Sequence, residues 1–294
     1  MSLIRISRSI FKKGFIAQTL RPYRIFTMLR RRRFSWRLAS VATLCGYFSI
    51  RTVYTEDQGS ELLDEDLERI VKKADQLFDN NEFEKLLEFL SAYKEYNEPK
   101  LLWRLSRANY KVALAKSTTK ERSKELAYKA VELVEKSLEL DSNSFAAHKW
   151  AGITLSHINK YEGFKSQIKQ AHQIKSYFDK SLKLHPNEPT TLHLLGQWCY
   201  SIADISWIER RIIATILATP PDSSFEEALE CFKKAEDQQP GFYSMNWLFL
   251  AKTLIKMNRL SEAKHWLDKL SNYRIENEED ENAVEEGKQL KKVI

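Results

Sequence analysis

The residue types that most often carry chemistry are present in this 294-residue chain, but they are widely spaced. The cysteines are Cys45, Cys199 and Cys231, and the histidines are His148, His157, His172, His185, His193 and His265. They match no zinc-ligand spacing, and no phosphate-cradling glycine loop or Gly-x-Ser-x-Gly elbow accompanies them. The carboxylates of Glu226 and Glu227 lie at a predicted helix start, where they complement the helix dipole. The sequence therefore predicts a non-catalytic protein with no metal and no cofactor, whose histidines lie on the surface or in a groove.

The cysteine usage indicates a reducing compartment. Three cysteines far apart in the sequence do not suggest a disulfide framework. Cys199 and Cys231 lie within apolar helical patterns, so we expect both to be buried thiols.

The elements that must position these residues are organised around the stretch 225–240, FEEALECFKKAEDQQP. Ala228, Phe232 and Ala235 share one helical face as a small, a large and a small side chain. Small residues let a neighbouring helix approach, and the aromatic ring fills the space between them. Pro240 then ends the helix. This pattern predicts the second helix of a tetratricopeptide-type hairpin, whose repeat is about 34 residues.

The same pattern recurs along the chain. Phe178, Ser181 and Pro186 keep the spacing of the aromatic, the second small residue and the proline, and the pair Leu195-Gly196 follows where the next first helix is expected. Two-helix units that cannot bury their own faces must stack. The sequence therefore predicts an all-α, tetratricopeptide-like solenoid over 61–294, with about five hairpins, a right-handed superhelical twist and a C-terminal capping helix.

The predicted helices are 62–79 with 82–96, 100–116 with 123–140, 144–158 with 161–184, a helix from Thr190 followed by 225–240, 243–257 with 260–272, and the capping helix within 276–294. The first pair turns at Asn80-Asn81, and Ser142 is a candidate cap for the third pair. Helix 161–184 is too long for one repeat, so the array is expected to be irregular there.

An insertion, 201–222, interrupts the array with the sequence SIADISWIERRIIATILATPPD. Trp207 precedes Arg210 and Arg211, and an apolar face follows. A long insertion in a repeat array often forms a functional surface. The alternative is that it packs along the solenoid groove and plugs it.

The inner helices of a solenoid line a concave groove, and helical position selects candidate contacts there. These candidates are Lys149, His193, Gln197, Tyr200 and Lys252, with Arg104 and Arg107 on the second hairpin. Each of them could equally be an ordinary packing or solvated position. Tetratricopeptide domains that clamp an acidic C-terminus use a set of lysines and asparagines. Here only Lys149 fits that set, so such a clamp is not expected.

The net charge of +7 is unevenly distributed. The first 55 residues hold 12 of the 47 basic residues and none of the 40 acidic ones, which leaves a net −5 on the remainder. The leader, 1–37, has the arginine- and serine-rich composition of a mitochondrial presequence. Its targeting candidates are Arg5, Arg8, Lys12, Lys13, Arg30, Arg31, Arg32 and Arg33. A disordered basic tail is the alternative, and although the arginine run could serve nuclear import, we expect no nucleic-acid partner.

Residues 38–50, LASVATLCGYFSI, form an apolar run that is shorter than the roughly 20 residues of a spanning helix. Membrane anchoring, an extension of the presequence and an ordinary apolar segment remain open. Residues 51–60 read as a polar linker.

Several segments resemble the regulator of microtubule dynamics family. They are 101–108 (LLWRLSRA), 144–150 (SFAAHKW), 193–200 (HLLGQWCY), 207–212 (WIERRI) and 218–221 (ATPP). The last two lie in the insertion and are not general features of the repeat. The resemblance covers about 65–275.

The resemblance implies a scaffold that associates with microtubules, the spindle and its poles, and that supports chromosome segregation. It also implies an alternative, a mitochondrial adaptor at organelle contacts, outer-membrane or imported, that binds phospholipid in the repeat groove. The first reading implies a location in the cytoplasm, on the cytoskeleton and at the spindle and its poles, and the second implies a mitochondrial location. Tubulin tails are acidic and the body is net negative, so contact would need the leader or a local patch near Arg104, Arg107, Arg210 and Arg211.

Overall fold

The structure is a computed structural model that describes residues 64–294, so the leader, the apolar segment and the linker lie outside the described part. The helices are α2 (Asp64–Asp79), α3 (Phe83–Ser91), η1 (Lys94–Tyr96), α4 (Pro99–Leu114), α5 (Lys120–Leu140), α6 (Phe145–Ile158), α7 (Phe164–Leu184), α8 (Pro189–Ala203), α9 (Trp207–Ile216), α10 (Phe225–Gln238), α11 (Ser244–Lys256), α12 (Leu260–Ser271) and α13 (Glu278–Lys291).

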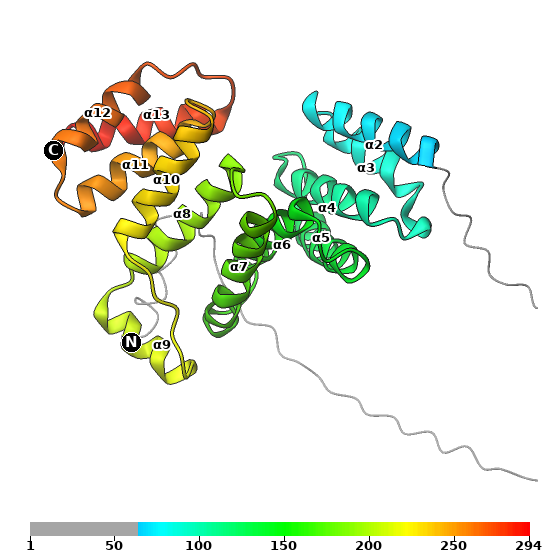
Figure 1. The fold of residues 1–294 in the computed structure, drawn as a ribbon, viewed down its shortest axis with the longest axis horizontal. Coiled ribbons are helices and arrows are strands. Elements are labelled where there is room, and N and C mark those ends of the chain that lie inside the picture. The colour runs from blue at the N-terminus through cyan, green and yellow to red at the C-terminus, as the bar shows by residue number, and fades with distance from the viewer. Residues whose placement is uncertain (1–63) are drawn as a thin grey trace, which may run out of the picture.

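The helices pack as consecutive pairs that stack into one array (Figure 1). The pairs are α2 with α3, α4 with α5, α6 with α7, α8 with α10, and α11 with α12, and α13 packs on the last pair. The prediction of an all-α array of five hairpins with a capping helix is confirmed. Helix α7 has 21 residues, but α5 has the same length, so helix length does not set the third repeat apart as expected.

Two of the hairpins are held by the small and large residues that the repeat pattern predicts. Ala228, Phe232 and Ala235 of α10 are all fully buried. The ring of Phe232 lies against Gly196 of α8, and Phe178 of α7 packs in the same way against Gly152 of α6. Because a glycine has no side chain, the backbones of the paired helices come close enough for the aromatic ring to fill the gap.

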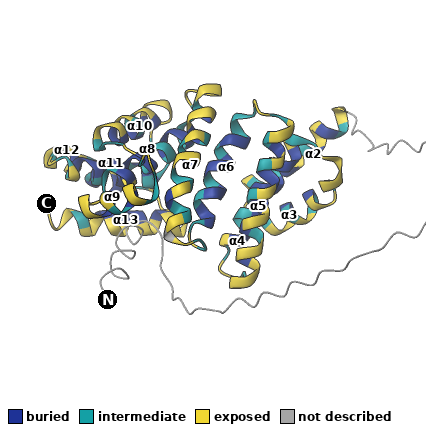
Figure 2. Ribbon diagram, turned by 90° about the horizontal axis from the view of Figure 1, so that it is seen from below, coloured by how far each residue is buried: buried dark blue, intermediate teal, exposed yellow. Residues whose placement is uncertain are grey.

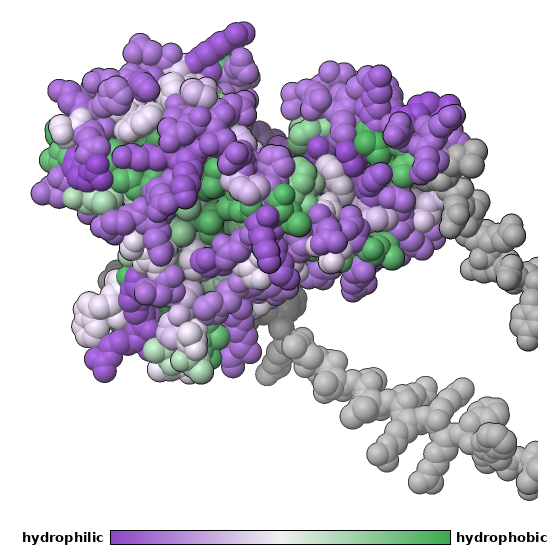
Figure 3. Space-filling view, viewed as in Figure 1, coloured by the Kyte–Doolittle hydropathy of each residue, from purple (hydrophilic) through white to green (hydrophobic). Residues whose placement is uncertain are grey.

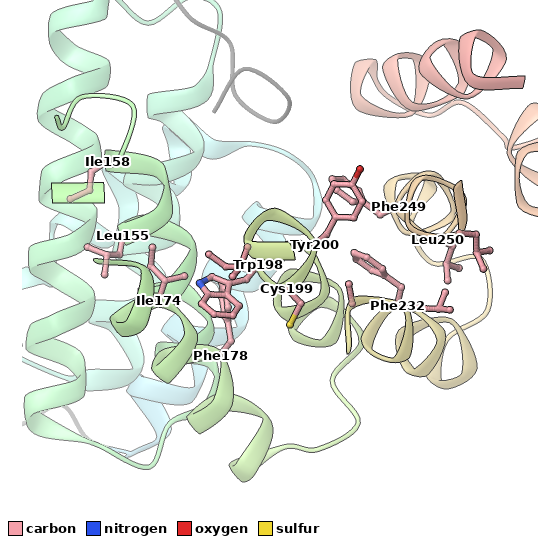
Figure 4. Packing of buried hydrophobic residues seen from close by; sticks show 14 of the residues in the cluster. Leu155, Ile158, Ile174, Phe178, Trp198, Cys199, Tyr200, Phe232, Phe249 and Leu250 are labelled. Carbon is pink, nitrogen blue, oxygen red and sulfur yellow. The ribbon is translucent and has the colours of Figure 1, made fainter. Parts of the chain in front are cut away.

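Buried side chains form four clusters along the array, and half-buried residues such as Phe78, Tyr177 and Trp247 connect one cluster to the next. In Figure 2 the buried residues follow the faces where neighbouring helices meet, and exposed residues cover the outer sides. In Figure 4, Phe178 and Trp198 lie between α7 and α8, and Tyr200 faces Phe249 of α11. The centroids of the last two rings are 5.4 Å apart in an edge-to-face arrangement.

Local signals fix the helix ends. Asn81 between α2 and α3 has a φ of 59°, in the left-handed region that asparagine tolerates, as expected for the predicted turn. Ser144 caps α6 by accepting a hydrogen bond from the Ala147 amide. The expectation that Ser142 caps this pair is wrong, because α6 begins two residues later and Ser144 is its N-cap.

Candidate functional site

The first feature of the inner face is a shared carboxylate between α2 and α4. Arg104 Nε and Nη2 donate to the two oxygens of Asp75 at 3.0 and 2.8 Å, and Arg107 Nη2 donates to Oδ1 at 2.7 Å. The guanidinium of Arg107 also lies over the ring of Phe78, 3.7 Å from its centroid. Two arginines one turn apart on α4 are thus held in place by one acid and one ring.

Positive charge is gathered along α4. Asp75 bonds to both arginines, Lys111 follows one turn further along the helix, and the charges of Asp79 and Glu279 also act on Arg107 and Lys111. We call Arg104, Arg107 and Lys111 the α4 basic cluster. Nε of Arg107 is buried and has no hydrogen-bond partner among the described residues. The cluster is therefore suited to an additional anion.

The pKa values agree with this arrangement. Partial burial opposes ionisation of Asp75, but the hydrogen bonds and charges of Arg104 and Arg107 outweigh it and lower the pKa of that carboxyl. Burial lowers the pKa of the Lys111 ammonium, and the nearby charge of Glu279 works against that effect. A negative group that approaches Lys111 therefore stabilises the charged form of its ammonium group.

Helix α13 brings such negative groups to the inner face. Glu278 Oε2 accepts from Lys116, just after α4, at 2.7 Å. Burial raises the pKa of Tyr110 on α4 to about 12, and the charge of Glu279 adds to the shift. Burial also raises the pKa of Tyr243, with Glu279 again contributing. The acidic first turn of α13 therefore reaches from the last hairpin to α4, a contact that the repeat pattern did not predict.

The remaining groove candidates are already engaged within the array. Lys149 pairs with Glu188 at 2.9 Å, with both side chains largely covered. Lys252 pairs with Glu286 of α13 at 2.7 Å. Gln197 is half-buried, and Tyr200 is only 8% exposed, packed between Phe225 and Phe249. Figure 3 shows apolar surface gathered over α8 and toward α6 on this side of the molecule.

The expectation that all histidines lie on the surface or in a groove is wrong for three of them. His148, His157 and His193 are 5%, 3% and 1% exposed. His193 Nδ1 lies 3.0 Å from Asn246 Oδ1, and its ring touches the aromatic core. Burial lowers the pKa of His193 to about 4. These histidines lie on α6 and α8, each the first helix of its pair. Such a helix packs against neighbouring helices on both sides, so its polar side chains can be buried between them.

The insertion forms helix α9 between α8 and α10. The structure assigns Ser201 and the next two residues to the end of α8, so the irregular part is shorter than 201–222. Ser206 and Glu209 form a capping box at the start of α9, and Ile213 is buried. Helix α9 packs on α7, which is the second, outer helix of the pair α6 and α7. The insertion therefore does not run along the inner helices, as the alternative of a plugged groove supposed.

The outward side of α9 carries large apolar residues. Trp207 is 66% exposed and Ile208 is 49% exposed. The guanidinium of Arg211 lies 5.5 Å from the Trp207 ring centroid. Arg210 turns inward, where it donates to the Ile202 carbonyl at 2.9 Å and pairs with Asp222 at 3.1 Å. Of the predicted insertion residues, Trp207 and Arg211 are therefore free to meet a partner, whereas Arg210 supports the loop.

The described residues show two further features of the chain's chemistry. No group of three or more histidine, cysteine and acidic residues within 64–294 comes together as a metal site. Among the described helices, none combines the length and the apolar character needed to cross a membrane.

Cys199 is buried as expected, but Cys231 is only half-buried, because it lines an open depression between α8 and α10.

The fold and the stacked pairs define a tetratricopeptide-like helical repeat protein. The structure superposes on a thermophilic TPR protein of Thermus thermophilus with a TM-score of 0.52 and 13% identity, covering 76% of this chain and 98% of that one. Identity at that level shows the fold alone.

Sequence comparison places the chain more narrowly. The family description "Regulator of microtubule dynamics protein 1-3" matches residues 70–294, and the chain belongs to this family. Regulator of microtubule dynamics protein 1 of Pongo abelii is 43% identical over 224 residues, which is 76% of this chain and 71% of that protein. The Mus musculus protein 1 is 42% identical over 76% and 73%. Regulator of microtubule dynamics protein 3 of Rattus norvegicus is 30% identical over 72% of this chain and 46% of its own length.

Proposed function

We propose that this chain is a non-catalytic scaffold that associates with microtubules and the spindle, supports chromosome segregation, and binds protein partners through its inner face. The carrying observation is the α4 basic cluster, where Arg104 and Arg107 share the carboxylate of Asp75 beside Lys111, on a face that also offers aromatic surface. Family membership supports the microtubule part of the proposal.

The charge of the cluster makes an acidic segment the fitting ligand. The residues that follow position 55 carry a net −5, so their net charge does not attract them to the acidic tails of tubulin. A local cluster works differently, because partly buried cations pair with carboxylates at lower desolvation cost than two fully hydrated groups. Arg104 and Arg107 are already fixed by Asp75, so little side-chain entropy is lost when a carboxylate arrives.

The experiment is cosedimentation of the full-length chain with microtubules and with microtubules whose acidic tails have been removed by subtilisin. The proposal expects binding to intact microtubules that falls at least several-fold when the tails are removed and that weakens with added salt. Equal binding to both, or no binding to either, would rule out capture of an acidic tail.

A second candidate function has its own observation, the exposed apolar side of α9. Trp207 and Ile208 beside Arg211 combine an aromatic ring, an aliphatic side chain and a cation, which suits the interface of a phospholipid membrane. This supports the proposal of a mitochondrial adaptor, outer-membrane or imported, at organelle contacts. The residues that would direct it there lie in the leader, outside the described part.

Two measurements separate the candidates. Localisation of the full-length chain beside a version that lacks 1–55, with the mature N-terminus read by mass spectrometry, distinguishes import from a cytosolic, cytoskeletal or spindle location. Flotation with anionic liposomes tests the α9 surface. Loss of flotation in Trp207→Ala, with flotation retained in the exposed control Thr215→Ala, would support the membrane candidate, whereas no flotation of the parent protein would remove it.

A further inference from the structure

Two cysteines from different helices meet where α8 and α10 approach most closely. The Phe232 ring lies 2.7 Å from where a side-chain carbon on Gly196 would be, which brings the two backbones together. Cys199 follows Gly196 by one turn on α8, and Cys231 directly precedes Phe232 on α10. Both are free thiols that line the same depression, and each changes the acidity of the other.

The pair is reachable from solvent. Both thiols line an open depression of about 390 Å³ between α7, α8 and α10. Leu182, Leu192 and Leu195 form its apolar side, and Lys175 and Glu227 lie on its polar side. Cys199 is 3% exposed and Cys231 is half-buried, so a small reagent can enter while a protein surface cannot.

The neighbouring thiols differ in acidity. The neighbouring thiol of Cys231 lowers the pKa of the Cys199 thiol, an effect that burial opposes and Ser223 assists. The same interaction raises the pKa of Cys231, because a second negative sulfur beside the first is unfavourable. A thiol of lowered pKa beside one that keeps its proton is the arrangement that favours disulfide chemistry. The described residues supply no third ligand that would make this pair a metal site.

We propose that Cys199 and Cys231 form a redox-active dithiol that a small peroxide oxidises to an intramolecular disulfide between α8 and α10. The Cys199 thiolate attacks one oxygen of hydrogen peroxide, the O–O bond breaks, and the departing hydroxide takes a proton to become water. The Cys231 sulfur then attacks the sulfenic sulfur, its proton leaves with the hydroxyl as a second water, and the S–S bond forms. Two thiols are oxidised and one peroxide is reduced to two waters.

The disulfide would act on the insertion. All of α9 and the segments that join it to α8 and α10 lie between Cys199 and Cys231 in the chain. A bond between them would close this segment into a loop and restrict the separation of α8 from α10 in the unfolded chain. Oxidation is therefore expected to raise the melting temperature and to make the segments that join α9 to α8 and α10 more rigid.

The experiment uses the full-length chain with Cys45→Ser, so that only the pair remains. The folded protein is treated with hydrogen peroxide, and its remaining thiols are labelled with a maleimide before intact-mass and peptide analysis. The expected result is the loss of two hydrogen atoms, no maleimide addition after oxidation and two after reduction, and a Cys199–Cys231 linked peptide whose yield is independent of protein concentration. Addition of dithiothreitol should reverse the rise in melting temperature.

Cys199→Ser and Cys231→Ser serve as matched controls, each keeping one thiol of the pair. Each should still fold, and neither should show the reversible thermal shift. The proposal would be overturned by disulfide-linked dimers in place of the internal bond, by sulfinic acid on one cysteine without linkage, or by two thiols that stay open to maleimide. The proposal does not depend on microtubule or membrane binding, so its failure would leave the proposed function untouched.

Discussion

The ring of Phe232 occupies the space that any side chain on Gly196 would need. A carbon built at the Cβ position of Gly196 would lie 2.7 Å from Cε1 of Phe232, closer than atoms in proteins approach. Phe178 stands in the same relation to Gly152 one hairpin earlier. In both of these hairpins the contact joins the two paired helices, so close packing at this point holds them together.

Gly196→Ala should therefore destabilise the protein by about 2 kcal/mol, because the extra methyl group overpacks a contact that has no room. Denaturant unfolding followed by circular dichroism measures the loss. Gly163→Ala is the matched control, since nothing lies within 4 Å of its added carbon, and its cost should stay below about 1 kcal/mol. Equal effects of the two substitutions would contradict the packing argument.

Ala228→Glu should cost about 3 kcal/mol or more, because it places a charge in a fully buried helix contact. Ala214→Glu on the exposed side of α9 gives the same change of residue at a solvated position, and its effect should stay within about 0.5 kcal/mol. A melting temperature that Ala228→Glu leaves unchanged would show that the repeat register is wrong.

Burial of His193 predicts a dependence of stability on pH. The pKa of His193 is lowered to about 4 in the folded protein, from an ordinary value of 6.5. Below pH 6.5 the unfolded chain binds a proton there that the folded protein does not, so stability falls as the pH decreases to about 4. The full effect is about 3 kcal/mol at 1.36 kcal/mol per pH unit.

The test compares unfolding free energies between pH 7 and pH 4.5 in the parent protein and in His193→Gln. The variant should show a shallower decline with falling pH. His265→Gln, at an exposed position, should keep the slope of the parent protein. A slope that His193→Gln leaves unchanged would mean that the histidine titrates normally in the folded state.

The repeat pattern predicted the hairpins because each helix carries its own small and large residues at helical spacing. Phe178, Phe232 and the alanines around them are local signals, and each one lies where the periodicity places it. The turn at Asn81 was equally local. Such features could be derived from the sequence because they depend on neighbours within one hairpin.

The inner face depends on contacts between distant segments, which no periodicity encodes. Asp75 binds Arg104 across 29 positions, and His193 meets Asn246 across 53. Glu279 reaches the surroundings of Tyr110 from the far end of the array. The sequence singled out His193 by helical position and Arg104 and Arg107 as a local basic patch, but only the packed array shows which partner each one has.

The acidic start of α13 should compete with an acidic ligand for the α4 basic cluster. Glu279→Gln removes a negative charge that acts on Lys111, so microtubule binding should strengthen by a few-fold. Glu285→Gln, on the exposed side of the same helix, changes the net charge equally and should have little effect. Weaker binding by Glu279→Gln would show that this carboxylate supports the site instead of competing for it.

The insertion should contribute to binding without contributing to stability. Arg211→Glu reverses an exposed charge beside Trp207, so a partner that meets this side of α9 should bind less tightly. Unfolding free energy should change by less than about 0.5 kcal/mol. Arg210→Glu should by contrast reduce stability, since it breaks the bonds to Ile202 and Asp222. Similar stability losses in both variants would mean that the whole insertion is structural.

The central claim, that the α4 basic cluster receives an acidic tail of tubulin, is tested most directly by carbodiimide cross-linking of the full-length chain to microtubules. This reagent joins a lysine to a carboxylate only where the two are in contact, and mass spectrometry locates the joined residues. The account predicts cross-links from Lys111 and its neighbour Lys116 to glutamates of the tubulin tails. Cross-links confined to leader lysines such as Lys12 and Lys13, with none on α4, would contradict it.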